Sequence, residues 1–382
     1  MKKTTFFVAI AITFTATLSS CKSTRLASND YDVEVVEVVE EPVRSVKNII
    51  LVIGDGMGPA QVTASIVQAQ GDNSQFLRFP YSGFSRTHSY DKYTTDSGAG
   101  GTAIVTGHKV QNGHIALSPN NRPWPSLFYT LNKEQGLSTG FVVTSSVLDA
   151  TPASTYAHVP DRHMWDRISL QMSQCPHTVM MGGDKEHFLP ANRKDDLSPL
   201  DTLRLRGYEL VYNIDSMVNS TSTKLVALPF MGNPPSAATR NDFLPKGVEK
   251  AISILNQDPD GFALLVEGSQ IDWAGHNNDS EFLKEELSDF EKTLKIILDF
   301  AEQDGNTLVV VTADHETGGL ALVNGNIENG TNDTRWIHGS HTAVMVPIFS
   351  YGPGSNYFSG IKQNTDIYHI IMNLFGQTIL EK

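Results

Sequence analysis

Five short apolar runs, each next to a polar cluster, constrain the fold of this chain more than any other feature. They occupy residues 48–53, 139–144, 262–266, 307–311 and 344–349. Continuous runs of this length and β-branched content are typical of strands buried on both faces of a mainly parallel sheet. Helix-like stretches lie between them, most clearly residues 282–303, where apolar side chains recur at helical spacing. The alternation predicts an α/β fold: a three-layer α/β/α sandwich around a large, mainly parallel central sheet.

The N-terminus predicts export. Residues 1–20 combine Lys2 and Lys3 with a short apolar stretch and small residues before Cys21. This pattern is typical of a secretory signal rather than a membrane span, which needs about twenty apolar residues. Cys21 at the cleavage point resembles the lipidated cysteine of bacterial lipoproteins; an ordinary signal peptide with a chance cysteine is the alternative. The expected location is the periplasm or outer membrane, with membrane contact only through a lipid on Cys21.

The rest of the chain divides into a linker and one large domain. Residues 21–45 carry acidic residues among alternating valines. We interpret them as a solvated tether, although the valine alternation alone could form a strand. Residues 46–382 are expected to form a single α/β domain. Within it, residues 176–245 are rich in glycine and proline and predict an irregular inserted region over the sheet edge or the active site.

The charge of the chain excludes some partners. The formal net charge is −13, and loss of Lys2 and Lys3 with the leader would take it to about −15. Such a surface argues against binding of nucleic acid or of anionic membranes. An acidic protein that holds an anionic ligand needs local cations, and bound metal ions are the obvious source.

Carboxylates and imidazoles follow the apolar runs. The seven candidate metal ligands of this kind are Asp55, Glu267, Asp272, His276, Asp314, His315 and His341. Asp272 and His276 stand four residues apart, which places both on one face of a helical turn. Singly, each residue has a simpler explanation as a turn, a cap or a surface histidine. Together, at strand ends that a parallel sheet brings to one edge, they predict a zinc site with nitrogen and oxygen ligands.

A candidate nucleophile lies in the small-residue run TDSGAGGTA at residues 95–103. If Ser97 begins a helix there, the free backbone amides and the helix dipole favour a bound phosphate group. A plain helix cap from Asp96 or Ser97 explains the same residues equally well. The chain has no GxSxG pattern, which disfavours an esterase-type serine.

Six motifs in a fixed order resemble those of the alkaline phosphatase family. They are GDGMG at 54–58, TDSGAGGTA at 95–103, DATPA at 149–153, EGSQID at 267–272, TADH at 312–315, and His341-Thr342 followed by YGP at 351–353. The pattern is closest to the bacterial lipoprotein-type members. The resemblance implies an alkaline-phosphatase-like fold and hydrolysis of phosphate monoesters through a phosphoserine intermediate. Ser97 would be the nucleophile and Arg162 the bidentate phosphate clamp. It also suggests a homodimer.

The resemblance implies three bound cations, two zinc ions and one magnesium ion. The implied ligands are Asp272, His276 and His341 for the first zinc, Asp55, Asp314 and His315 for the second zinc, and Asp55, Thr151 and Glu267 for magnesium. Two positions near the site vary within the family. Asp149 matches members with an acid near magnesium, and Trp273 replaces a lysine or histidine that other members direct at phosphate. We therefore expect weaker inhibition by phosphate than in members with lysine.

Two other functions remain open at this level. A phosphodiesterase or a metal-dependent phosphomutase of the same metal-site superfamily would share most of the ligands. Arg162 favours monoesters because a guanidinium can bind two free phosphoryl oxygens. A lipid-anchored protein that captures phosphate or metal without turnover is the alternative from a different class. The chain retains Ser97 and every expected ligand, which argues against it.

Overall fold

The computed structural model describes residues 45–376. The predicted signal peptide, Cys21 and nearly all of the tether predicted at 21–45 lie outside the described residues. Within residues 45–376, no helix is both long enough and apolar enough to span a bilayer.

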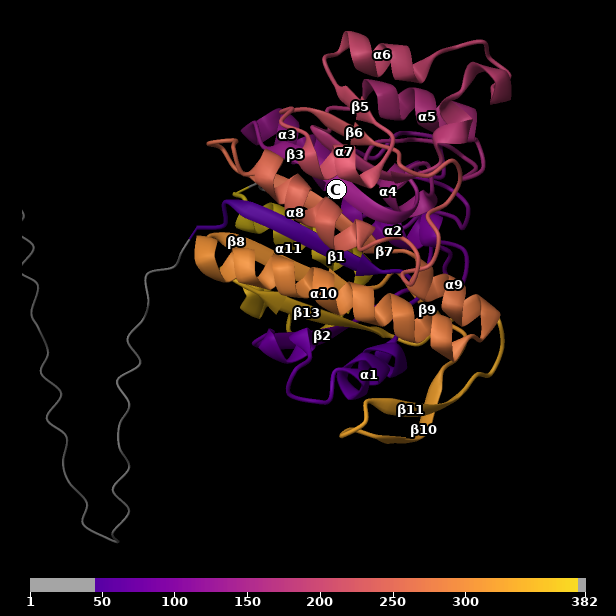
Figure 1. Cartoon of the computed structure of the whole chain (residues 1–382), viewed down its shortest axis with the longest axis vertical. Coiled ribbons are helices and arrows are strands. Elements are labelled where there is room, and N and C mark those ends of the chain that lie inside the picture. The colour runs from indigo at the N-terminus through magenta and orange to yellow at the C-terminus, as the bar shows by residue number, and fades with distance from the viewer. Residues whose placement is uncertain (1–44, 377–382) are drawn as a thin grey trace, which may run out of the picture. The chain divides into compact units, whose positions relative to one another are not determined.

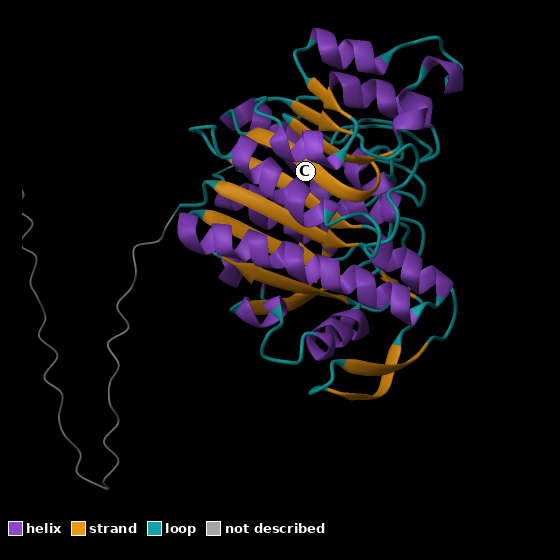
Figure 2. Cartoon of the chain, viewed as in Figure 1, coloured by secondary structure: helices purple, strands orange, loops and turns teal. Residues whose placement is uncertain are grey.

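A ten-stranded sheet forms the centre of the domain (Figures 1 and 2). In spatial order its strands are β14 (Gly360–Gln363), β2 (Tyr81–Arg86), β13 (Val346–Tyr351), β8 (Thr307–Thr312), β1 (Asn48–Gly54), β7 (Phe262–Gly268), β3 (Ser138–Ser146), β4 (Val179–Gly183), β6 (Leu225–Ala227) and β5 (Glu209–Val211). Every neighbouring pair is parallel except the two that involve β13. The mainly parallel sheet predicted from the apolar runs is confirmed.

The antiparallel direction of β13 matters for the site. Phe349 of β13 pairs with Val311 of β8, and Tyr351 pairs with Val309. The start of β13 therefore lies at the edge where the parallel strands end. Residues just before β13, including His341, reach the same edge as residues just after β8.

Alternate residues of the central strands pack into opposite layers. Ile49, Leu51 and Ile53 of β1 belong to one apolar core, whereas Ile50 and Val52 belong to the other. Successive side chains of a strand point to opposite faces, so a strand covered on both sides must be apolar at every position. This is why the strands appear in the sequence as uninterrupted runs.

Helices cover both faces (Figure 2). One core includes side chains from α2 (Ser97–Thr106), α3 (Leu127–Gln135), α4 (Ala150–Ser154), α5 (Trp165–Gln174), α6 (Pro199–Leu205) and α11 (Asn364–Leu374). The other includes side chains from α1 (Pro59–Gln68), α7 (Ile214–Asn219), α8 (Phe243–Leu255), α9 (Gln270–Asn277) and α10 (Ser280–Asp304). The helical periodicity at residues 282–303 corresponds to α10, whose Leu287, Phe290 and Leu294 are buried.

The region 176–245 is more regular than its composition predicts. It supplies β4, β6 and β5, which extend one edge of the central sheet. These strands are three to five residues long, too short to stand out among the surrounding prolines and glycines. Part of the region is thus a component of the sheet itself, and its status as an inserted region stays a prediction.

Candidate metal centre

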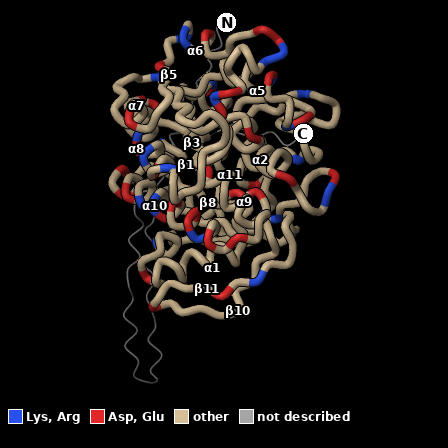
Figure 3. The backbone as a smooth tube through the Cα atoms, turned by 45° about the vertical axis from the view of Figure 1, so that its right-hand side comes forward, with Lys and Arg blue, Asp and Glu red and all other residues tan. Residues whose placement is uncertain are grey.

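The predicted ligands gather at the carboxyl edge of the sheet, on segments that follow its central strands. Asp55 follows β1, and Asp314 and His315 follow β8. Glu267 is the penultimate residue of β7. Asp272 and His276 lie on α9, directly after β7. His341 lies in the short strand β12 (His341–Thr342), which pairs with β9 (Glu316–Thr317). In Figure 3, acidic segments lie beside the labels of α9 and β8.

The Nε2 atoms of His276 and His341 face each other. Their Nε2 atoms are 3.1 Å apart. Nδ1 of His276 lies 3.0 Å from the carbonyl oxygen of Gly339, and Nδ1 of His341 lies 2.9 Å from that of Thr95. Because a carbonyl only accepts, each Nδ1 carries the hydrogen, which leaves a lone pair on each Nε2 of the neutral rings. Two lone pairs at this distance need a proton or another cation beside them.

Asp272 completes this first cluster. Its carboxylate oxygens lie 3.3 Å from Nε2 of His276 and 3.7 Å from Nε2 of His341. Burial opposes its ionisation, but the hydrogen bond with His276 and the charges of His315 and His341 lower the pKa of Asp272 to about 2. The same hydrogen bond raises the pKa of His276 to about 9. Burial and the charge of His315 lower the pKa of His341 to about 4. The cluster therefore combines a carboxylate with an imidazole that stays neutral at neutral pH.

A second cluster surrounds His315. Its Nε2 lies 3.2 Å from Oδ2 of Asp314 and 3.5 Å from Oδ1 of Asp55. Oγ of Ser97 lies 3.4 Å from the same nitrogen. On the other side of the ring, Nδ1 lies 3.2 Å from the hydroxyl of Thr317. That hydroxyl already donates to Asp272, so it accepts from Nδ1, and Nε2 of the neutral ring is left with a lone pair toward Ser97 and the acids.

Asp55 and Glu267 lie at the ends of neighbouring strands. Ile53 of β1 pairs with Glu267 of β7, and Asp55 follows two residues after Ile53, just beyond the end of β1. Burial and the negative charges of Asp314, Asp272 and Glu267 raise the pKa of Asp55 well above its usual range. Burial and the charge of Asp149 raise the pKa of Glu267 to about 8. These are the shifts expected where several carboxylates share a dry site without a cation.

The residues fit divalent cations. Among residues 45–376, three buried site oxygens have no hydrogen-bond partner: Oδ1 of Asp55, Oδ2 of Asp314 and Oγ1 of Thr151. An unpartnered buried oxygen is costly, and a carboxylate more so. Asp272, His315 and His341 form one set whose ligand atoms lie within 4.8 Å of one another, and Asp55, Asp314 and His315 form another. The mixed nitrogen and oxygen donors suit zinc, and the oxygen donors of Asp55, Thr151 and Glu267 suit magnesium.

Ser97 is the first residue of α2, and Asp96 caps this helix. Oδ1 of Asp96 accepts from the backbone N–H of Ala99 at 3.0 Å. Both readings of this segment from the sequence are thus compatible, because the cap belongs to Asp96 and Ser97 remains available. The backbone N–H groups of the first turn and the helix dipole favour negative charge beside Ser97.

Arg162 reaches the site from the loop before α5. Its Nη1 donates to Asp96 at 3.2 Å and its Nη2 donates to Asp149 at 2.9 Å. Asp149 also caps α4, the helix that carries Thr151. A guanidinium has five N–H donors, so these two bonds orient Arg162 and leave donors for an anion. Asp96 as a partner of Arg162 was not apparent from the sequence, since 66 residues separate them.

Trp273 is half-buried on α9, next to Asp272. Within residues 45–376, the side chain of Trp273 makes no hydrogen bond to a site group. A further group, Asp184, Glu186 and His187, follows β4. There Oδ1 of Asp184 contacts His187 and Oδ2 accepts from Ser146, so both carboxylate oxygens of Asp184 have partners.

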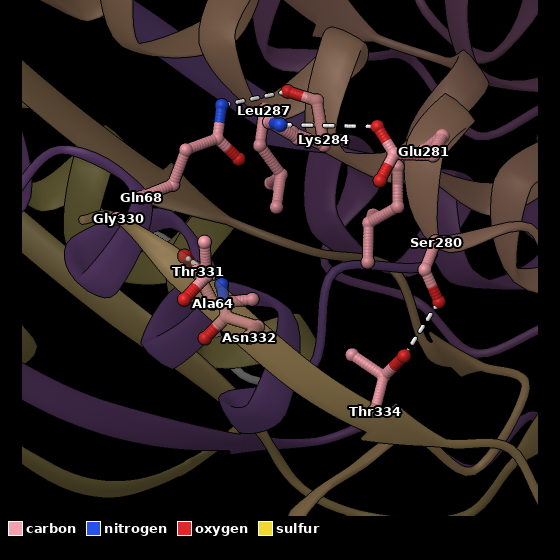
Figure 4. Close-up of a pocket in the computed structure, with 11 residues that line it drawn as sticks. Ala64, Gln68, Ser280, Glu281, Lys284, Leu287, Gly330, Thr331, Asn332 and Thr334 are labelled. Carbon is pink, nitrogen blue, oxygen red and sulfur yellow. Dashed lines mark hydrogen bonds and ion pairs between the residues drawn. The ribbon is translucent and has the colours of Figure 1, made fainter. Parts of the chain in front are cut away.

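A separate cavity of about 180 Å³ lies between α1, the start of α10 and the hairpin strand β11 (Thr331–Arg335) (Figure 4). Side-chain contacts cross its lining, including the bond from Gln68 to the carbonyl oxygen of Lys284 at 2.8 Å and the one between Ser280 and Thr334 at 2.6 Å. Among the residues that the structure describes, the lining of this cavity includes none of the predicted site residues.

Comparisons with known proteins agree with the site. The family model described as alkaline phosphatase matches residues 46–333. The chain is 30% identical to alkaline phosphatase 4 of Bacillus subtilis, over 86% of this chain and 88% of the relative. The solved alkaline phosphatase from the Antarctic bacterium TAB5 is 32% identical, with a TM-score of 0.81 over 88% of this chain and 100% of that chain.

A variant of the TAB5 enzyme, also 32% identical, has been solved with magnesium in its M3 site; its TM-score is 0.80 over 88% of this chain and 100% of that chain. The family match spans most of residues 45–376, and the likeness in fold extends over the same domain. The chain belongs to the alkaline phosphatase family.

Proposed function

We propose that this chain, a phosphoric monoester hydrolase by family, works through a covalent phosphoserine intermediate at Ser97 with two zinc ions and one magnesium ion. The observation that carries the proposal is the position of Oγ of Ser97, 3.4 Å from Nε2 of His315. His315 belongs to both sets of candidate ligands, so the hydroxyl lies next to the side chain that the two sets share.

We propose the following roles for the site residues. Oγ of Ser97 attacks the phosphorus atom, a new Oγ–P bond forms, and the bond to the ester oxygen breaks with release of the alcohol. Water then attacks the phosphoserine, breaks the Oγ–P bond and restores the serine, with net retention at phosphorus. Arg162, oriented by Asp96 and Asp149, binds two phosphoryl oxygens throughout. The bound cations would stabilise the charge on the attacking and leaving oxygens.

The ligand assignment is part of the proposal. The first zinc would be held by Asp272, His276 and His341, the second by Asp55, Asp314 and His315, and magnesium by Asp55, Thr151 and Glu267. The approach of the histidine Nε2 atoms to the carboxylates and the unpartnered oxygens support this assignment. The magnesium in the TAB5 variant is consistent with a magnesium site in this family.

We also infer that the protein is exported to the periplasm or outer membrane, attached by lipid on Cys21, and homodimeric. The pattern of residues 1–21 supports the first two inferences. The family resemblance supports the third.

Replacement of the nucleophile tests the chemistry. Ser97→Ala should lower kcat for p-nitrophenyl phosphate by about 10³-fold or more, because the covalent path is lost. Acid quenching of the wild type with radiolabelled phosphate should trap label on Ser97, and the variant should trap none. Bis-p-nitrophenyl phosphate should be a poor substrate of the wild type. Full turnover by Ser97→Ala would contradict the proposed intermediate.

Metal removal should change the pH dependence of stability. In the metal-free chain, Glu267 keeps its proton up to about pH 8 when folded but ionises near its usual pKa of 4.5 when unfolded. The free energy of unfolding should therefore fall as the pH rises from about 6.5 to 8, by about 2 kcal/mol from this group. The raised pKa of His276 also lowers the free energy of unfolding over this pH interval. In the folded chain His341, whose pKa is lowered to about 4, is already neutral at pH 6.5.

Urea denaturation after EDTA treatment measures this effect at pH 6.5 and pH 8. Saturating zinc and magnesium should largely remove the loss, and Glu267→Gln should reduce it in the metal-free chain. A metal-free stability that is constant or rises over this interval would show that the acids are not crowded as described.

Trp273 tests how the site releases product. Trp273→Lys should lower the inhibition constant of inorganic phosphate roughly fivefold, equivalent to about 1 kcal/mol, since it adds a cation near the anion. Trp273→Phe is the matched control, because it changes size without adding charge. An unchanged constant in the lysine variant would refute a role for this position in phosphate affinity.

The lipid anchor is tested by metabolic labelling with a radioactive fatty acid. The wild type and Cys175→Ser should incorporate label, and Cys21→Ser should not. Cys175 is a suitable control because it is the buried free cysteine of the described domain. An unlabelled wild type, or a labelled Cys21→Ser chain, would exclude the anchor.

A further inference from the structure

Glu316 is a buried carboxylate that the proposed mechanism does not use. It directly follows His315 and is 3% exposed. Its hydrogen-bond partners within residues 45–376 are all neutral donors. Burial of an unpaired carboxylate is expensive unless several hydrogen bonds replace water. The presence of such a buried carboxylate beside a proposed metal ligand therefore calls for a structural explanation.

The donors to Glu316 come from three separate segments of the chain. Oε1 accepts from Nε2 of Gln61 on α1 at 3.0 Å and from the backbone N–H of Leu320 at 3.1 Å. Oε2 accepts from the backbone N–H of Gly319 at 3.3 Å and from the hydroxyl of Thr342. One carboxylate thus connects the segment after Asp55, the turn after β9, and β12.

These contacts lie beside two proposed metal-ligand histidines, His315 and His341. β9 and β12 form a ladder of only two pairs, in which Thr342 faces Glu316 and His341 faces Thr317. So short a ladder is weak alone, and the side-chain bond between Thr342 and Glu316 reinforces it across the strands. His315 directly precedes β9 and His341 is the first residue of β12. Their rings stack with centroids 3.6 Å apart.

The loop that carries Asp55 is shaped around the same side chain. A Cβ atom on Gly58 would lie 2.2 Å from Cγ of Glu316 and 2.9 Å from its Cβ. Gly58 has an ordinary φ of −81°, so the glycine is needed for this close approach rather than for its backbone conformation. The last glycine of the GDGMG motif therefore has a physical explanation in Glu316.

We propose that Glu316 is a positioning residue of the metal centre. By holding α1, the turn at 318–320 and Thr342 together, its carboxylate keeps His315 and His341 at the spacing that zinc requires, an inference that rests on the proposed function. Outer groups that orient metal ligands commonly change metal affinity by about 10- to 100-fold when they are removed.

Zinc retention tests the proposal without reference to turnover. Glu316→Ala, loaded with zinc and magnesium and shown to be folded by circular dichroism, is mixed with an excess of a chromogenic chelator. Zinc should dissociate at least about tenfold faster than from the wild type. Thr342→Val keeps the side-chain shape but removes one donor to Glu316, and should accelerate dissociation to a smaller extent. This second variant applies if Glu316→Ala does not fold.

Glu291 provides a matched control. Its carboxylate also connects α1 to other segments, as it accepts from Ser65 at 2.8 Å, Ser74 at 2.6 Å and the backbone N–H of Gln75 at 2.7 Å. Neither Glu291 nor any of these partners is adjacent in sequence to a proposed metal ligand, whereas Glu316 and Thr342 directly follow His315 and His341. Glu291→Ala should lower the thermal unfolding temperature but leave the zinc dissociation rate unchanged.

Each outcome has a distinct meaning. Unchanged zinc dissociation in folded Glu316→Ala or Thr342→Val, or equal acceleration in Glu291→Ala, would overturn the positioning role while the proposed function stands. A wild-type chain that binds no zinc at all would overturn the proposed function, and the role of Glu316 with it.

Discussion

Mutual repulsion among buried acids is the constraint on which the rest of this structure depends. Asp55, Asp314 and Glu267 lie together at one edge of the sheet, where burial and the charges of neighbouring acids raise the pKa values of Asp55 and Glu267. The Nε2 atoms of His276, His341 and His315 lie beside these acids. Proteins tolerate such a concentration of donors where cations neutralise it. A site with local positive charge then explains how an acidic protein attracts an anionic ester, which the net charge of the chain would repel.

Close approach of the backbone makes this concentration possible. A Cβ atom on Gly56 would lie 2.7 Å from Cα of Asp272, and one on Gly100 would lie 3.0 Å from Cβ of Asp314. Segments that are far apart in the sequence can thus bring their candidate metal ligands into one small volume. The small residues of α2 allow the helix that begins at Ser97 to pack directly against the segment after β8, which contains Asp314.

The order of the strands decides which segments meet. β1 lies between β8 and β7, so the residues after these three strands become neighbours, although more than 200 positions separate the segment after β1 from the other two. The reversed direction of β13 brings His341 to the same edge. Periodicity indicates that strands exist and are covered on both faces. It does not indicate their order or direction, because these depend on packing between distant segments.

By itself, the sequence determined the fold class, the central strands and the family, since uninterrupted apolar runs and six ordered motifs are local patterns. It also identified the residue types that gather at the carboxyl edge. Only the tertiary structure decided that β4, β6 and β5 extend the sheet, that Asp96 and Asp149 orient Arg162, and that Glu316 connects α1 to Thr342. Short strands leave little periodic signal, and a hydrogen bond between distant residues leaves none, because such contacts form only when the packed sheet brings those residues together.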